Sequence, residues 1–152
     1  LKNIRKGATA QTMIDMGRKI RAAGIKLSIT VLLGLAGRER SQAHAEATGN
    51  VLSAIDPEYV GALSLMLIPG TPLHDDYEAG RFELLDAREM LAELRTMFAP
   101  TDLSSGLFHA NHASNYLPIR AKLPQDKEKT IQLIDAALDG KVSLKPEFLR
   151  AL

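Results

Sequence analysis

The spacing of apolar and polar residues predicts alternating helices and strands in the first part of the chain. Residues 9–23 place apolar side chains at helical spacing, with Thr9 as the N-cap and Gly24 as the stop. Residues 25–33 alternate and then become fully apolar, which predicts a strand covered on both faces. A second helix with Ser41 as its cap and a second strand over residues 60–68 follow.

The rest of the chain is predicted to be mainly helical. Asp86 and Glu89 have the spacing of a capping box and open a helix with an apolar face. Residues 101–123 show no sustained periodicity and are predicted to form a long loop, a kind of segment that is often functional in compact domains. Residues 124–138 predict a further helix, and residues 145–149 a terminal helical turn.

Alternating helices and strands predict the α/β class, with parallel strands and helices outside them. Two strands cannot bury their apolar faces alone, so we expect part of a barrel or of an open sheet. We divide the chain into βα units over residues 1–100 and a loop with a helical C-terminal extension over residues 101–152.

Composition excludes several kinds of protein. The 152 residues contain no cysteine, which excludes disulfides, thiolate metal sites and cysteine nucleophiles. A formal net charge of +1 argues against a broad nucleic-acid surface or a polybasic membrane arm. Since no apolar stretch reaches the roughly 18 residues that span a bilayer, we expect a cytoplasmic protein. The first residue is Leu1, so we expect the chain to begin inside a larger protein.

Both predicted strands end in glycine. The first runs into Gly34-Leu35-Ala36-Gly37 and the second into Pro69-Gly70-Thr71-Pro72. Neither matches a dinucleotide-binding fingerprint or a phosphate-binding loop. The glycines are explained either by tight turns with positive φ or by the close approach of the backbone to a flat ligand.

Three segments in this order resemble the C-terminal half of the barrel of radical S-adenosylmethionine (radical SAM) enzymes. They are Lys6-Gly7-Ala8-Thr9, the segment from Thr30 to Gly37, and Leu67-Ile68-Pro69-Gly70-Thr71-Pro72-Leu73. The most similar branch contains the oxygen-independent coproporphyrinogen III oxidases and the elongator-type and methylthiotransferase-type enzymes. The resemblance covers about residues 1–86 and implies a partial TIM-type (β/α) barrel.

The resemblance implies a cofactor site and also a missing part. Enzymes of this family hold a 4Fe-4S cluster on three cysteines and cleave S-adenosylmethionine to a 5′-deoxyadenosyl radical, which abstracts hydrogen from the substrate. Because this chain has no cysteine, we expect it to be inactive alone and to need the missing N-terminal barrel half. The family's pattern places the cofactor contacts of this half at Lys6, Thr30, Leu32, Gly34, Leu67 and Ile68.

A second group of polar residues lies in the predicted loop. It contains His109, Asn111, His112, Asn115 and Tyr116. The group could contact a substrate over a barrel mouth, or its side chains could satisfy the loop's own backbone. Alternatively, His109 and His112 could bind a metal in a different β/α-barrel lyase or hydrolase. A last alternative is a non-catalytic fragment that self-associates through an exposed sheet edge.

Overall fold

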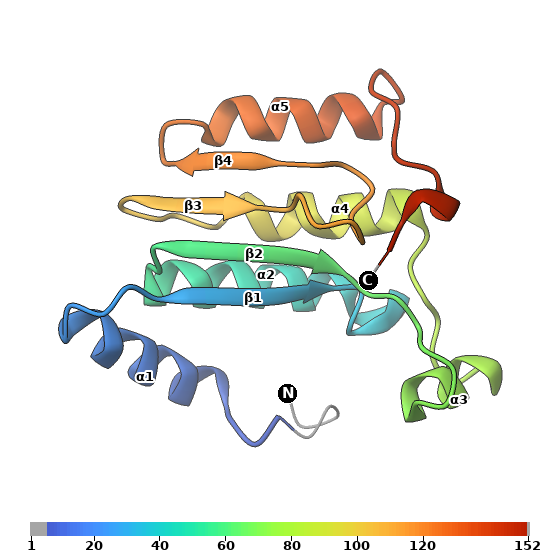
Figure 1. Cartoon of the computed structure of the whole chain (residues 1–152), viewed down its shortest axis with the longest axis horizontal. Coiled ribbons are helices and arrows are strands. Elements are labelled where there is room, and N and C mark those ends of the chain that lie inside the picture. The colour runs from blue at the N-terminus through green and yellow to red at the C-terminus, as the bar shows by residue number, and fades with distance from the viewer. Residues whose placement is uncertain (1–5, 152) are drawn as a thin grey trace.

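The computed structural model describes residues 6–151 as an α/β fold (Figure 1). The elements follow one another as α1 (Ala10–Ala22), β1 (Ser28–Leu33), α2 (Gly37–Ile55), β2 (Tyr59–Ser64), α3 (Pro72–Glu78), α4 (Ala87–Phe98), β3 (Gly106–His109), β4 (Arg120–Leu123), α5 (Lys127–Leu138) and the 3₁₀ helix η1 (Glu147–Leu149). The first five residues of the segment that carries the radical SAM resemblance, and Leu152, lie outside the described residues.

The strands form an open, mixed sheet whose order, β1-β2-β3-β4, follows the order of the chain. β1 pairs with β2 and β2 with β3 in parallel, whereas β3 and β4 are antiparallel. The predicted α/β class and the parallel β1–β2 pair are therefore confirmed. The two further strands were not predicted.

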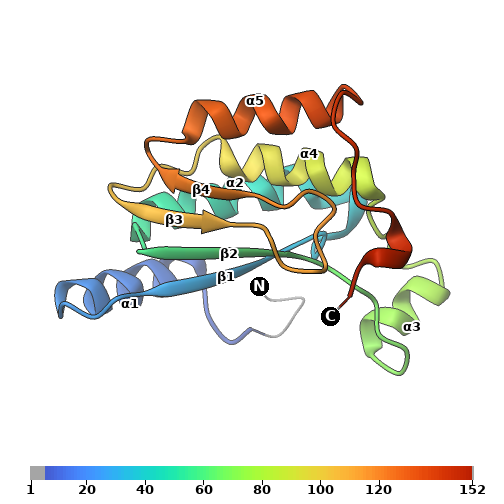
Figure 2. The ribbon, with the colours of Figure 1, turned by 45° about the horizontal axis from the view of Figure 1, so that its top comes forward.

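The helices α2, α4 and α5 lie on one face of the sheet. In Figure 1, β2 and β3 pass in front of α2 and α4, and Figure 2 shows the same three helices together on one side. Burial along the strands agrees, since Val60, Ala62, Phe108 and Ala121 are buried while their neighbours in sequence are less so. Within residues 6–151 no helix covers the opposite face, which we call the open face.

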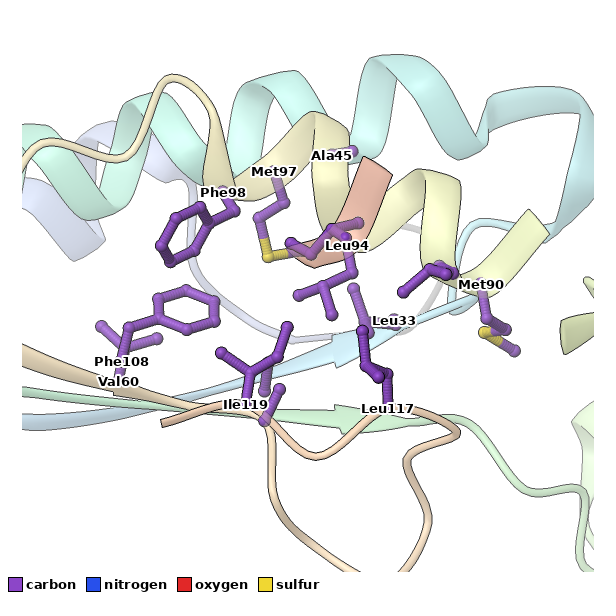
Figure 3. Close-up of a cluster of buried hydrophobic side chains, with 14 of the residues drawn as sticks. Leu33, Ala45, Val60, Met90, Leu94, Met97, Phe98, Phe108, Leu117 and Ile119 are labelled. Carbon is purple, nitrogen blue, oxygen red and sulfur yellow. The ribbon is translucent and has the colours of Figure 1, made fainter. Parts of the chain in front are cut away.

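The core fills the space between the sheet and these helices (Figure 3). Phe98 of α4 and Phe108 of β3 are fully buried and meet edge to face, with ring centroids 4.9 Å apart and an interplanar angle of 88°. Such pairs contribute roughly 0.5–1.5 kcal/mol beyond the area they bury. Gly49 of α2 allows equally close packing, because a Cβ there would collide with the Met97 carbonyl oxygen.

Two predicted caps are confirmed. The Thr9 hydroxyl accepts a hydrogen bond from the Thr12 amide at 3.1 Å at the start of α1. At the start of α4, the Asp86 carboxylate accepts from the Glu89 amide at 2.9 Å, and the Glu89 carboxylate accepts from the Asp86 amide at 2.8 Å. These local patterns could be predicted because both partners lie within one helical turn.

Three boundaries differ from the prediction. Helix α2 begins at Gly37 rather than after Ser41. The Glu83 carbonyl oxygen accepts a hydrogen bond from the Arg38 amide there and takes the place of a side-chain cap. Strand β2 ends at Ser64 rather than at Ile68, and the short helix α3 follows the Pro-Gly turn. Residues 101–123 are not one loop, because they contain β3 and β4. Each of these strands has four residues, too few for a clear alternation.

None of the helices within residues 6–151 is both long enough and apolar enough to cross a membrane.

Candidate functional site

Four residues form a row across the open face. The strand register pairs Thr30 with Gly61, Gly61 with His109, and His109 with Arg120. Each of the four follows or precedes a residue that faces the helices, so all four lie on the open face. The row reaches the carboxyl end of β3, the edge at which open α/β sheets bind ligands.

Gly61 makes this row flat at its centre. A Cβ at Gly61 would have Thr30 Oγ1, at 4.0 Å, as its nearest neighbour, so packing does not require a glycine there. A glycine inside a strand often marks a place where a ligand approaches the backbone closely. The open face thus has a bare strip of backbone between Thr30 and His109.

Arg120 ends the row with a positive charge. With its amide oxygen turned toward Arg120, Asn111 accepts hydrogen bonds from the Nε and Nη2 atoms, each at 3.1 Å. Asn111 lies two residues after His109, so the alternation of an extended chain brings it to the same face. The predicted substrate residues His109 and Asn111 are therefore close to Arg120, which the sequence analysis did not single out.

Five of the six predicted cofactor residues fall into three places. Thr30 and Leu32 lie together on the open face of β1, and Leu32 pairs with Leu63 of β2. Lys6 is exposed before α1, and Leu67 and Ile68 follow the carboxyl end of β2. The structure thus brings Thr30 and Leu32 together and places Lys6, Leu67 and Ile68 beyond the row.

Gly34 lies behind the open face, in the packing against α4. It is buried and has φ +80°, and a Cβ there would collide with the Met90 side chain. Gly37, at φ +71°, also needs the left-handed conformation. The tight-turn explanation of these two glycines is confirmed by their φ angles.

A buried carboxylate of α4 supports the turn that follows β1. The Glu93 side chain is fully buried and accepts hydrogen bonds from the Gly34 amide at 2.8 Å and from the Ser41 hydroxyl. His44 Nδ1 lies 3.0 Å from the same carboxylate. The turn after β1 is therefore held by α4 through one side chain.

Asn115 is engaged by the chain itself. It is 2% exposed, its Oδ1 accepts from the Ser64 hydroxyl at 2.9 Å, and its Nδ2 donates to the Ala62 carbonyl at 2.8 Å. Ser114 adds a second link, because its hydroxyl accepts from the Ser64 amide at 3.2 Å. These bonds fasten the β3–β4 connection to the end of β2.

Tyr116 belongs to a second internal network. Its hydroxyl donates to Glu147 at 2.5 Å and accepts from Arg150 at 2.6 Å, and the Arg150 guanidinium lies 4.2 Å from the ring centroid. Arg150 is buried and also donates to the Ser114 and Leu65 carbonyls. The network holds the C-terminal segment against the ends of the strands.

Stability at high pH should report on Tyr116. Burial, together with the hydrogen bond to Glu147, raises the pKa of Tyr116 from 10.0 to about 12. Because the pKa is higher in the folded state, neutral Tyr116 contributes to the free energy of unfolding. This contribution is complete below pH 10 and is lost as the pH rises toward 12. We expect the free energy of unfolding, measured with urea, to fall over this range. The fall should be smaller in Tyr116→Phe, and an equal fall in both proteins would contradict the assignment.

The predicted metal alternative has little support in the described residues. His112 Nδ1 lies 3.0 Å from the Ser114 hydroxyl and also accepts from the Ser114 amide. Among residues 6–151, no group of three or more histidine, aspartate or glutamate side chains is placed to hold a metal ion. A 4Fe-4S cluster does not fit this chain either, because the sequence has no thiolate to bind it.

Comparisons with protein-family models, curated proteins and solved structures found no match to this chain.

Proposed function

We propose that this chain is the C-terminal part of a radical SAM enzyme and supplies the nucleoside side of its cofactor site. The observation that carries the proposal is the sheet with helices on one face only. In a β/α barrel the helices lie outside and the bare face of the strands lines the interior. The row from Thr30 to Arg120 lies on that bare face.

The sheet also indicates where the rest of a barrel would join. The antiparallel strand β4 ends the parallel series on one side, and β1 is the edge strand on the other. A parallel series can therefore be extended only at β1. An N-terminal barrel half would pair with this edge, which otherwise offers a surface for self-association.

Residues on the open face suit the parts of S-adenosylmethionine. Leu32 and Leu63 offer an apolar surface for adenine, and the Thr30 hydroxyl can hydrogen-bond to ribose. Lys6 is a cation suited to the methionyl carboxylate, and Leu67 and Ile68 offer backbone groups near the adenine. In the intact enzyme, the cluster and S-adenosylmethionine would supply the 5′-deoxyadenosyl radical. This chain contributes binding surface only.

The proposal is tested by reading the gene upstream of Leu1 and producing the joined protein. We expect three cysteines spaced C-x-x-x-C-x-x-C, one 4Fe-4S cluster per joined chain, and 5′-deoxyadenosine on reduction with S-adenosylmethionine. Leu32→Lys should weaken S-adenosylmethionine binding at least about tenfold, or 1.4 kcal/mol, because it places a charge against the adenine.

A matched control is Leu133→Lys, which changes a partly exposed leucine of α5 in the same way. It should leave S-adenosylmethionine binding unchanged. A joined protein that binds no cluster, or one in which both leucine variants bind the cofactor equally well, would contradict the proposal.

A further inference from the structure

We infer that the β3–β4 side of the open face is an anion subsite that binds a carboxylate or phosphate group of the substrate. The site consists of Arg120, Asn111 and His109. That the anion belongs to a substrate rests on the proposed function, whereas the anion site itself depends only on the geometry of these three residues.

Arg120 has donors left for an anion. Its guanidinium carries five N–H groups, and Asn111 accepts from Nε and Nη2 only. The Asn111 amide oxygen occupies the edge of the guanidinium formed by Nε and Nη2. The N–H groups of Nη1 and the second Nη2 hydrogen remain available to a ligand. Two parallel donors at one edge match the two oxygens of a carboxylate or phosphate.

No carboxylate of the described chain neutralises this charge. Ion pairs within residues 6–151 engage five other arginines, and none of them involves Arg120. The paired arginines are Arg21, Arg38, Arg81, Arg95 and Arg150. Arg120 is exposed and held by a neutral amide, so its charge remains available to a ligand.

The surrounding strands add positive charge and no negative charge. None of β1 to β4 contains an aspartate or a glutamate. Lys122 lies two residues after Arg120 on the same side of β4, and His109 is directly opposite Arg120 in the register. The cations of this corner are Arg120 and Lys122, and the Asp126 carboxylate accepts from the Lys122 backbone amide at 2.8 Å without forming an ion pair to Arg120.

The row has room for two ligand groups side by side. Neighbouring strands are about 4.8 Å apart, so β1 and β4 are separated by about 14 Å across the open face. A nucleoside at Thr30 and Leu32 would leave β3 and β4 free, and the bare backbone at Gly61 would lie between the two groups. The anion at Arg120 would then fix the orientation of a substrate whose reacting part extends toward Gly61.

The test is an NMR titration of the uniformly ¹⁵N-labelled 152-residue chain. The probes are inorganic phosphate and succinate, each exchanged against sodium chloride at constant ionic strength, with succinamide as the neutral analogue. We expect saturable shifts at the amides of residues 107–111 and 120 with at least one of the two anions and none with succinamide. The anion that binds more tightly identifies the phosphate or the carboxylate class.

The matched variants are Arg120→Gln and Arg40→Gln, the second on an exposed position of α2. We expect Arg120→Gln to weaken anion binding at least tenfold and Arg40→Gln to leave it unchanged, with both proteins folded by circular dichroism. Absence of saturable shifts, or equal binding by both variants, would overturn the subsite.

Failure of this inference can be told apart from failure of the proposed function. Binding of phosphate or succinate through Arg120, combined with a joined protein that binds no cluster, would keep the subsite and overturn the radical SAM assignment. A joined protein that cleaves S-adenosylmethionine, combined with a chain that binds neither anion, would overturn the subsite alone.

Discussion

Replacing Glu93 with alanine is expected to lower the free energy of unfolding by about 4 kcal/mol, because it leaves buried donors without an acceptor. The Glu93 carboxylate accepts from the Gly34 amide and the Ser41 hydroxyl and contacts His44, and its side chain is fully buried. Alanine would also leave a cavity between α4 and the turn after β1. Equilibrium urea unfolding followed by circular dichroism measures the change.

Two variants show whether the lost hydrogen bonds are the cause. Glu93→Gln keeps the volume and one acceptor oxygen, so we expect a loss of about 1–2 kcal/mol. Glu46→Ala removes an exposed carboxylate of α2 that accepts from Gln42, and we expect a change within about 0.5 kcal/mol. If Glu93→Ala unfolds at the same urea concentration as Glu46→Ala, the carboxylate does not hold the turn.

Replacing Gly61 with valine is expected to abolish most ligand binding without destabilising the fold. A side chain at Gly61 enters open space, with Thr30 Oγ1 as its nearest neighbour at 4.0 Å. Glycine inside a strand is unfavourable by roughly 0.5–1 kcal/mol, so the free energy of unfolding should stay equal or rise. The two methyl groups would occupy the strip between Thr30 and His109. A ligand forced away from the backbone should bind about 10- to 100-fold more weakly.

The measurements are urea unfolding of the chain and S-adenosylmethionine binding by the joined protein. Ser28→Val is the matched control, because Ser28 lies on the same side of β1 but outside the row. It should bind S-adenosylmethionine like the unchanged protein. If Gly61→Val is as stable as expected but binds the cofactor with unchanged affinity, the ligand does not lie on this strip.

The sequence allowed prediction where the interacting groups are close together in the chain. The Asp86–Glu89 capping box and the Thr9 cap each involve residues three apart, and both are confirmed. The turn at Gly34 and Gly37 was also among the predicted explanations. In contrast, the start of α2 depends on the Glu83 carbonyl, 45 residues from Arg38, which no local pattern could indicate.

The candidate site was predicted only in part, for a similar reason. The sequence left open whether the polar side chains from His109 to Tyr116 contact a ligand or satisfy the chain itself, and Asn115 and Tyr116 have partners on β2 and near the C-terminus. Arg120 and Gly61 meet His109 through strand pairing, and β3 and β4 are too short to be predicted from periodicity. An isolated glycine in the predicted second strand was the available signal for Gly61. The radical SAM function itself remains a prediction.

The order of the strands has a consequence for synthesis of the chain. Because β1, β2, β3 and β4 are neighbours in both sequence and sheet, each strand after β1 pairs with the strand translated before it. We expect the β1-α2-β2 unit to form before β3 is translated, since local connections close with little loss of chain entropy. The docking of Arg150 onto the Leu65 carbonyl, 85 residues earlier, would follow the pairing of the strands. Released chains truncated before Arg150 should therefore still contain the paired strands, but with a more protease-sensitive C-terminal segment.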